Sequence, residues 1–311
     1  MYTIIFDPIS DEALEYAYEN LEKVIKWDEI KDEDLDNCEA CIIRVYKLDK
    51  ETIDKMPNLK IIAKHGVGTD SIDLDYAKEK GIRVTNTPTA NSNSVAELIV
   101  GLSLAVSRKI VESHNKVLDG VDRISPPDLT GFELSGKTLG TIGLGNIGSI
   151  AVNTFMNGFD MKVLVYDPYI DQSQCDEYGI VKVESLDELL KESDIINISV
   201  PLTDSTENMI TKNQINLMKN NAIIINCSRG KIVNEADLYG ALKAGRIFGA
   251  AMDAFEVEPV KKDNPLLTCN NFIATPHNGA NTIDALIKMG TRAIDEIVRK
   301  NAGEENHYIV V

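Results

Sequence analysis

The sequence predicts an α/β fold with two domains, each built on a parallel sheet. Short, β-rich apolar runs alternate with segments of helical periodicity along most of the chain, as in βαβ units. One such run, 138–142, is followed by closely spaced glycines and a helical segment, which is typical of the start of a doubly wound domain. With 311 residues, the chain is long enough to form two cores.

The first part of the chain predicts a small parallel α/β domain that ends near Pro88. Strands are expected at 2–6, 40–45, 59–63 and 82–85, and helices at 11–25, 52–56 and 75–80, the first with Ser10 as its N-cap. A long helix is expected next, over 92–118. Its first two-thirds is apolar on more than one face, which predicts burial between domains or subunits. Prolines and glycines then indicate an irregular surface connection over 119–134.

The second part predicts a larger domain with six strands. The strands are expected at 138–142, 162–166, 194–200, 222–226, 248–252 and 272–274, and the helices between them at 147–156, 185–192, 212–218 and 234–244. This number is sufficient for a doubly wound sheet of the Rossmann type, whose ligand crevice lies at the carboxyl ends of the strands. A last helix, 282–300, and the tail are expected to return to the first domain. The predicted domains are therefore 1–91 with 282–311, and 92–281.

The glycines that follow the first strand of the second domain predict a dinucleotide site. Gly143, Gly145 and Gly148 have the spacing G-x-G-x-x-G, which allows a tight turn, a close approach of pyrophosphate to the backbone, and close packing of helix on strand. Asp167 ends the next strand, about 20 residues further on, where a carboxylate accepts hydrogen bonds from ribose hydroxyls and repels a 2′-phosphate. We therefore expect NAD rather than NADP; the alternative is that Asp167 only forms the turn before Pro168.

Composition argues against several classes of protein. The net charge of −17 argues against a nucleic-acid-binding surface. No apolar run has transmembrane length, and the N-terminus shows no basic region or cleavage site, so we expect a cytoplasmic protein with no membrane partner. The five scattered cysteines fit a reducing compartment. Cys38 and Cys41 form a C-x-x-C, but no second pair or nearby histidine completes a zinc site, so we expect buried structural thiols and no metal.

Three ionisable residues follow neighbouring strands of the second domain: Arg229, Glu258 and His277. An arginine can hold a carboxylate and polarise a carbonyl, a histidine can exchange the alcohol proton, and a carboxylate beside it favours the protonated ring. Each residue also has a purely structural interpretation. Arg229 could form a surface ion pair, Glu258 could be a loop charge before proline, and His277 could be a hydrogen-bonded histidine at a strand end. Their occurrence together after a dinucleotide motif favours hydride transfer.

Motifs along nearly the whole chain carry a specific resemblance. They read LKIIAKHGVGTDSIDL, TNTPTANSNSVAELIVGL, GKTLGTIGLGNIG, VPLTDSTENMI, INCSRGKIVNEADLYGAL, AAMDAFEVEP and TPHNGANT. Together they resemble the D-isomer-specific 2-hydroxyacid dehydrogenase family, especially its phosphoglycerate dehydrogenase branch. The resemblance implies a Rossmann domain plus a smaller flavodoxin-like substrate domain, with a cleft between them and hinges near Pro88 and Gly279. It also implies hydride transfer between NAD and C2 of a D-2-hydroxy acid, and a homodimer formed through the nucleotide domain and the long helix.

The resemblance assigns roles to particular residues. Arg229 would bind and polarise the 2-keto acid, and His277 would exchange the proton. Glu258, and not Glu256, would be the partner of His277, because Glu258 directly precedes proline as the family's glutamate does. The implied cofactor-binding residues are Gly143, Gly145, Asn146, Ile147, Gly148, Asp167, Val200, Pro201, Cys227, Ser228, Asp253 and Gly279. Of these, Asn146 and Ile147 would meet the pyrophosphate, Val200 and Pro201 the adenosine, and Cys227, Ser228 and Asp253 would lie near the nicotinamide.

The implied substrate residues lie in the first domain. The backbone of Val67 and Gly68 would hold the substrate carboxylate. Arg44 and Lys47 match basic positions near the phosphate in phosphoglycerate dehydrogenases, and Lys64 would add a third charge, which favours 3-phosphoglycerate and serine biosynthesis. An arginine at position 44 also occurs in members that act on unphosphorylated acids, so glyoxylate, hydroxypyruvate and other small 2-keto acids stay open. His65, where a small residue is more common, is expected to reshape the substrate pocket.

Some features depart from the family pattern. Ser199 stands where many members carry a histidine, and the connection 119–134 lacks a common tryptophan, which leaves the adenine pocket and the subunit surface open. The chain ends at Val311, so we expect no C-terminal regulatory domain and no serine inhibition through one. A non-catalytic NAD-sensing co-regulator is the alternative from another class. The complete catalytic set argues against it, and the short N-terminal region argues against a formate dehydrogenase.

Overall fold

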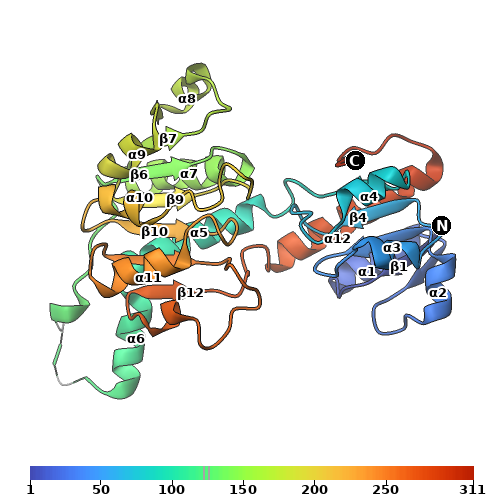
Figure 1. Cartoon of the computed structure of the whole chain (residues 1–311), viewed down its shortest axis with the longest axis horizontal. Helices are drawn as coiled ribbons and strands as arrows, with labels where there is room; N and C mark the ends of the chain where they lie inside the picture. Colours follow the sequence, from blue (N-terminus) through green and yellow to red (C-terminus); the bar gives the residue numbers. More distant parts are fainter. Residues whose placement is uncertain (122, 125–126) are drawn as a thin grey trace. The chain divides into compact units, whose positions relative to one another are not determined.

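The computed structural model describes residues 1–121, 123–124 and 127–311, apart from the side chains of residues 177 and 178. The chain forms two compact units. Unit 1 comprises Met1–Ser94 and Ala280–Val311, so it carries both termini, and unit 2 comprises Val95–Gly279 (Figure 1). Among the described residues, no helix has the length and apolar character needed to cross a membrane.

Unit 1 is a five-stranded parallel sheet with helices on both faces. Its elements are β1 Tyr2–Ile5, α1 Asp11–Asn20, β2 Lys23–Ile25, α2 Asp32–Asn37, β3 Ala40–Ile43, α3 Lys50–Asp54, β4 Ile61–Lys64, α4 Leu74–Glu79, β5 Arg83–Thr85 and α12 Ile283–Ala302. The strand order β2-β1-β3-β4-β5 is that of the flavodoxin-like doubly wound fold, as the sequence predicts. The C-terminal tail pairs with β5 through Val310 N–H to Val84 C=O (2.8 Å) and Val84 N–H to Val311 C=O (3.0 Å).

The alternation of side chains along the strands divides the core of unit 1 into two layers. Ile4, Cys41, Ile43 and Ile62 pack on one face, beneath residues of α3 and α4 such as Ile53 and Tyr76. Ile5, Ile42, Ile61 and Ala63 pack on the other face, beneath α1 and α12. The strands β3 and β4 are buried on both faces, so they read as continuous apolar runs, as expected of central strands in a parallel sheet.

Unit 2 is a seven-stranded parallel sheet. Its elements are α5 Ser92–Ser107, whose first residues belong to unit 1, α6 Ile110–Asp119, the 3₁₀ turn Pro127–Leu129, β6 Thr138–Ile142, α7 Asn146–Phe159, β7 Lys162–Tyr166, α8 Gln172–Tyr178, β8 Val181–Lys182, α9 Leu186–Glu192, β9 Ile195–Ile198, α10 Lys212–Leu217, β10 Ile223–Asn226, α11 Glu235–Lys243, β11 Gly249–Met252, the 3₁₀ turn Pro265–Thr268 and β12 Phe272–Ala274.

The strand order of unit 2, β12-β11-β10-β9-β6-β7-β8, is the Rossmann order with one strand added at the β12 edge. The order reverses between β6 and β9, so the ligand crevice of such a sheet is expected at the carboxyl ends of these two strands. Apolar residues of α9, α10 and α11 cover one face of the sheet, and those of α5, α7 and α8 cover the other. The predicted fold class is confirmed.

Three predictions about secondary structure were wrong. The helix expected over 11–25 ends at Asn20; Leu21 has extended backbone angles (φ −115°, ψ 143°), and Lys23–Ile25 is strand β2. Leu21 and Val24 continued the helical spacing by coincidence: both pack against the core of unit 1, but Leu21 follows the helix and Val24 is the middle residue of β2. The helix expected over 92–118 is two helices, since Lys109 lies in the left-handed region (φ 51°) and interrupts it.

The third error is the strand number of unit 2. Strand β8 has two residues, and together with helix α8 it lies in a stretch that shows no clear apolar period. Helix α2, with the sequence DEDLDN, was missed for the same reason. Of the connection predicted over 119–134, residues 122, 125 and 126 lie outside the described residues.

Candidate active site

The glycine turn after β6 has the geometry that a dinucleotide needs. Gly143 has φ +90°, and a Cβ there would lie 2.6 Å from the carbonyl oxygen of Ser199. A Cβ on Gly148, within α7, would lie 2.6 Å from the carbonyl oxygen of Gly143. A Cβ on Gly145 would meet nothing within 4 Å, so the backbone at the start of α7 is open on that side. The first and third glycines therefore allow close packing, and the second leaves the helix N-terminus accessible to a pyrophosphate.

Asp167 lies beside this turn, at the end of β7. Its Oδ2 accepts the Leu144 N–H (3.0 Å) and its Oδ1 accepts the Tyr169 N–H (2.9 Å). The two bonds orient the carboxylate, and each oxygen keeps a lone pair for a ribose hydroxyl. Val200 follows β9 on the other side of the turn, where its Cγ1 would lie 2.8 Å from a Cβ at Gly143. The residues present thus fit NAD, with Asn146 and Ile147 in the first turn of α7.

His277 and Glu258 form a hydrogen-bonded pair after the carboxyl ends of β12 and β11. His277 Nδ1 lies 2.8 Å from Glu258 Oε2, and Glu258 Oε1 accepts the N–H of Phe255 (3.0 Å). Because the carboxylate is an acceptor, the proton on Nδ1 is donated to Glu258. Nε2 is therefore the ring nitrogen that gains or loses a proton when the ring charge changes.

The pair favours a charged histidine beside an ionised glutamate. The hydrogen bond to Glu258 raises the pKa of His277 above its ordinary value, although burial opposes this. Burial alone would raise the pKa of Glu258, but the hydrogen bonds from His277 and from the Phe255 N–H outweigh it and lower that pKa. A ring held in this way is suited to donating a proton and taking it back.

Asp253 organises the loop that carries His277. Its side chain is buried; Oδ1 accepts the Thr275 hydroxyl (2.6 Å) and the Asn278 N–H (2.6 Å), and Oδ2 accepts the Gly279 N–H (2.8 Å). The Asp253 carbonyl accepts the His277 N–H (2.7 Å). These bonds hold His277 at φ 53°, an uncommon conformation for a residue other than glycine.

Arg229 follows β10 and is held by Asn226, to which the sequence assigned no role, and by Ser228. The fully buried Asn226 donates its Nδ2 to the Arg229 carbonyl (2.8 Å), while its Oδ1 accepts the Ser228 N–H and hydroxyl. Arg229 Nη1 donates to the Ser228 carbonyl (2.8 Å). A polar residue that ends an otherwise apolar strand is the signal that could have identified Asn226, and the same holds for Thr275 after β12.

Gly230 brings the loops after β10 and β11 into contact. A Cβ at this position would lie 2.0 Å from the carbonyl oxygen of Phe255 and 2.7 Å from the nitrogen of Glu256. The loop that carries Arg229 therefore packs directly on the loop that leads to Glu258. The positive charge of Arg229 lowers the pKa of both Glu258 and His277, as expected of groups in one site.

Cysteine chemistry has no place in this arrangement. Burial raises the pKa of the Cys227 thiol, so it stays protonated and does not act as a thiolate nucleophile. Cys38 and Cys41 are buried in unit 1; burial raises the pKa of Cys38 to about 12 and that of Cys41 as well. Among the residues that the structure describes, no three or more His, Cys, Asp or Glu side chains gather in a way that could hold a metal ion.

The six predicted substrate residues lie at the carboxyl ends of two neighbouring strands of unit 1. Two of them follow β3, and the other four are the last residue of β4 and residues of the loop after it. Arg44 Nη2 donates to Asn281 Oδ1 (3.3 Å), and the exposed Lys47 pairs with Asp49 (3.3 Å). The loop at Val67 and Gly68 is tied down by Asn86, whose Nδ2 donates to the Val67 carbonyl (2.9 Å). The nearby Gly66 has φ +134°.

His65 and Lys64, two of the predicted substrate residues, are both buried in unit 1. The ring of His65 is 2% exposed; its Nε2 lies 3.2 Å from the Leu286 carbonyl of α12, and burial lowers its pKa to about 4. Lys64 is 6% exposed, and its Nζ donates to the Arg44 carbonyl (2.5 Å) and to Ser71 Oγ (3.1 Å). Both side chains turn into unit 1, where Lys64 Nζ and His65 Nε2 have polar partners, while His65 Nδ1 is buried without one.

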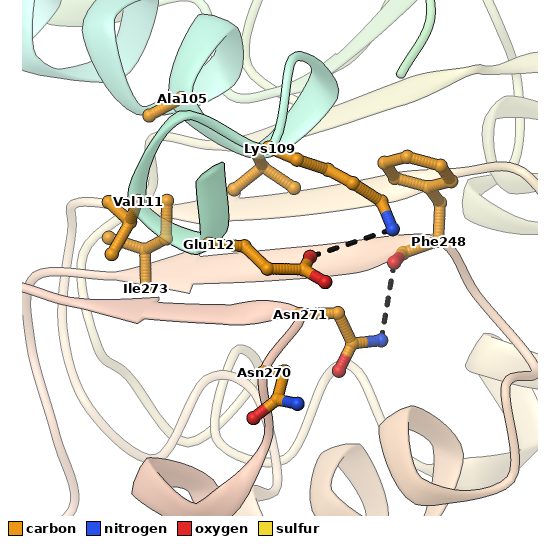
Figure 2. Close-up of a pocket in the computed structure, with 9 residues that line it drawn as sticks. Ala105, Lys109, Val111, Glu112, Phe248, Asn270, Asn271 and Ile273 are labelled. Atoms are coloured by element: carbon orange, nitrogen blue, oxygen red, sulfur yellow. Dashed lines mark hydrogen bonds and ion pairs between the residues drawn. The ribbon is translucent and has the colours of Figure 1, made fainter. Parts of the chain in front are cut away.

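A pocket in unit 2 lies apart from His277 and Glu258. Figure 2 shows it between α5, α6 and the amino ends of β11 and β12, lined by Ala105, Val106, Lys109, Val111, Glu112, Phe248, Asn270, Asn271 and Ile273. Lys109 pairs with Glu112 across it (3.5 Å), and Asn271 Nδ2 donates to the Phe248 carbonyl (3.2 Å). Since His277 and Glu258 follow the carboxyl ends of the same strands, this pocket is at the opposite edge of the sheet.

Unit 2 is thus a Rossmann-type dinucleotide-binding unit with a histidine–glutamate pair and an arginine at its ligand edge. Residues 100–279 match the family described as D-isomer specific 2-hydroxyacid dehydrogenase, NAD binding domain. The chain belongs to this family, and the dinucleotide for which its glycine turn is built is NAD, as the sequence predicts.

Relatives of known name include several kinds of reductase and dehydrogenase. The chain is 42% identical over 306 residues to D-3-phosphoglycerate dehydrogenase of Methanocaldococcus jannaschii, covering 97% of this chain and 57% of that protein. It is 39% identical to hydroxypyruvate reductase of Thermotoga maritima, covering 94% of this chain and 92% of that protein. The structure of D-lactate dehydrogenase from Aquifex aeolicus complexed with NAD and lactic acid superposes with a TM-score of 0.82 at 33% identity, covering 97% and 96% of the two chains.

The phosphoglycerate dehydrogenases that this chain matches are longer than the chain. This chain spans 57% of the length of the phosphoglycerate dehydrogenase of Methanocaldococcus jannaschii and 58% of that of Archaeoglobus fulgidus.

Proposed function

We propose that this chain is an NAD-dependent oxidoreductase that transfers a hydride between the nicotinamide and C2 of a D-2-hydroxy acid. The observation that carries the proposal is the 2.8 Å pair of His277 and Glu258, which stands with Arg229 after adjacent strands of an NAD-binding sheet. An arginine and a protonated histidine are the groups that a 2-oxo acid needs on its carboxylate and carbonyl oxygen.

In the direction of reduction, His277 supplies the proton. Arg229 binds the carboxylate of the 2-oxo acid and polarises its carbonyl, and Nε2 of His277 donates its proton to the carbonyl oxygen. The glycine turn and Asp167 would hold NADH, which would supply the hydride. Glu258 stabilises the charged ring before transfer and keeps Nδ1 protonated afterwards. In the direction of oxidation, the neutral ring takes the proton back from the alcohol. Asp253 and Asn226 act through the backbone, because they hold the loops of His277 and Arg229.

For the substrate, we favour 3-phosphoglycerate and 3-phosphohydroxypyruvate, which would place the enzyme in serine biosynthesis. The support is Arg44 and Lys47 after β3, and the similarity to proteins named D-3-phosphoglycerate dehydrogenase. In this proposal the backbone of Val67 and Gly68 holds the carboxylate end of the acid, and Arg44 binds the phosphate.

The second candidate is the reduction of hydroxypyruvate, glyoxylate or another small 2-oxo acid. One observation favours it: the burial of Lys64 removes one of the three charges expected to bind a phosphate. Similar proteins named hydroxypyruvate reductase and glyoxylate reductase add support.

Oxidation of NADH with a panel of 2-oxo acids tests the function and separates the candidates. The panel is 3-phosphohydroxypyruvate, hydroxypyruvate, glyoxylate, pyruvate and 2-oxoglutarate. We expect the highest kcat/KM with 3-phosphohydroxypyruvate. A preference for an unphosphorylated acid would keep the chemistry and replace the substrate, whereas NADH binding without turnover of any acid would favour a non-catalytic NAD sensor.

We further propose that the protein is a homodimer formed through α6. This helix carries exposed apolar side chains, namely Ile110, Val111, Val117 and Leu118. Such a cluster is unfavourable in water unless a partner covers it. Light scattering is expected to give twice the chain mass for the wild type and the chain mass for Leu118→Glu. Ile283→Glu, at an exposed apolar site in unit 1, serves as the control and should stay dimeric.

A cytoplasmic location is also proposed. Its support is that all five cysteines are free thiols, as expected in a reducing compartment.

A further inference from the structure

The loop of residues 44–46, called the Arg44 loop below, is held from both sides by buried charges. It follows β3, whose neighbours in the sheet are β1 and β4. Asp7 lies just after β1, and Lys64 is the last residue of β4. Their side chains are 7% and 6% exposed. Because the three strands are parallel, both charges reach the loop at the same edge of the sheet.

Asp7 contacts the loop through its backbone. Asp7 Oδ2 accepts the N–H groups of Arg44 (2.6 Å), Val45 (3.0 Å) and Tyr46 (2.9 Å). Successive N–H groups that converge in this way form a concave anion site. Here the protein's own carboxylate fills it, so these N–H groups are not available to an anionic substrate. Within the Arg44 loop, the group that is left to bind an acidic group of the substrate is therefore the Arg44 side chain.

Lys64 contacts the loop on its other side. Its Nζ donates to the Arg44 carbonyl (2.5 Å) and to Ser71 Oγ (3.1 Å). The ring of Tyr46 stacks on the ring of Phe6, the residue that directly follows β1, with ring centroids 4.5 Å apart. The peptide groups on both sides of the Arg44 Cα are thus hydrogen-bonded to buried charges, which fixes the backbone position from which the Arg44 side chain extends.

We propose that Asp7 and Lys64 are positioning residues that hold Arg44 so that it selects 2-oxo acids with a second acidic group. This inference rests on the proposed function. It assigns to Asp7 a part in substrate choice, although its side chain is buried and does not meet the substrate. It also explains why the chain keeps two opposite charges buried at the end of an otherwise apolar sheet, where each costs free energy unless it is hydrogen-bonded.

The test compares kcat/KM for 3-phosphohydroxypyruvate with that for glyoxylate in wild type, Asp7→Asn, Arg44→Ala and the double variant. We expect Asp7→Asn to raise KM for the phosphorylated acid by about 10-fold, because a neutral amide accepts the three N–H bonds of the loop more weakly than the carboxylate, and the loss of charge assistance changes an affinity by roughly that factor. KM for glyoxylate and kcat for both acids should change less than about twofold. In the Arg44→Ala background, Asp7→Asn should add no further loss, because Asp7 acts through Arg44.

The control is Asp73→Ala in the same unit. Asp73 caps α4 by accepting the Tyr76 N–H (3.0 Å), so its loss lowers the melting temperature without touching the Arg44 loop. The ratio of the two kcat/KM values should stay at the wild-type level in this variant. If Asp7→Asn does not fold, Lys64→Met, which keeps the stem and removes the ammonium, takes its place in the same cycle.

Several outcomes would contradict the inference in different ways. An unchanged ratio in Asp7→Asn, or full additivity with Arg44→Ala, would refute the positioning role and leave the proposed function intact. Absence of turnover of every acid in the panel by the wild type would refute the proposed function and the selection role together, whereas turnover of an unphosphorylated acid without turnover of 3-phosphohydroxypyruvate would refute the selection role alone.

Discussion

Replacement of Gly230 by alanine tests whether the contact between two loops sets the catalytic geometry. A Cβ at this position would lie 2.0 Å from the Phe255 carbonyl oxygen and 2.2 Å from its carbon, and both are backbone atoms that cannot rotate away. Real Cβ contacts are essentially never below 3.0 Å, so the loops after β10 and β11 must separate by at least the difference, about 1 Å. The first loop carries Arg229 and the second leads to Glu258, so this separation changes the distance between two proposed catalytic groups.

The expected loss of rate follows from that displacement. A misplacement of about 1 Å costs on the order of 100-fold in rate, and overpacking of this kind costs about 1–3 kcal/mol of stability. We therefore expect kcat of Gly230→Ala to fall about 100-fold with the best acid of the panel. The affinity for NADH should hardly change, because the glycine turn at Gly143–Gly148 lies elsewhere along the sheet edge.

Gly240→Ala is the matched control. Gly240 lies within α11 of the same unit, and a Cβ there would meet nothing within 4 Å. Alanine at this helical position should raise stability by up to about 1 kcal/mol and leave the rate unchanged. Steady-state kinetics, NADH fluorescence and thermal unfolding of both variants check the expectation. A Gly230→Ala enzyme with a rate within twofold of wild type would refute the assigned role of the loop contact.

The remaining predictions concern the paired residues and the cofactor. His277→Ala should lower kcat by about 10²–10⁴-fold, the usual contribution of a general acid, with little effect on NADH binding; near-normal turnover would refute its role. Glu258→Gln should shift the pH dependence of reduction. Because the hydrogen bond to Glu258 raises the pKa of His277, the wild-type reaction is present at low pH and is lost as pH rises through that raised pKa. The variant should lose activity at a lower pH, and an unshifted kcat/KM profile would argue against the pairing. Asp167→Ala should weaken NADH binding and bring the affinities for NADH and NADPH closer together, as measured by fluorescence titration; an unchanged preference for NADH would exclude Asp167 as its source.

The sequence predicted those parts of the site that depend on local chain geometry. The spacing of Gly143, Gly145 and Gly148 has meaning within a single strand–turn–helix unit, so it could be read without knowing the fold. The placement of Arg229 and His277 after strands was predictable for a related reason. In a parallel sheet all carboxyl ends meet at one edge, so a strand-end residue is brought near the others whatever the order of the strands.

Other features depend on neighbours that are distant in the sequence. Asp7 has no visible role in the sequence, since the N–H groups it binds are 37 to 39 residues away. Lys64 and His65 look like substrate residues in sequence, but their burial depends on Ser71 and on α12, near the end of the chain. The interruption at Lys109 was hidden because helical periodicity continues on both sides of it.

The sequence by itself therefore determined the fold class, the dinucleotide turn and the three strand-end residues, because each follows from local backbone geometry or from the parallel arrangement of strands. Only the tertiary structure decided which charges are buried, which loops touch at Gly230, and what holds Arg44 and His277 in place. The physical reason is that a hydrogen bond or a close packing contact requires its two partners within a few ångströms of each other. Which distant residues come that close is decided by the packing of whole strands and helices.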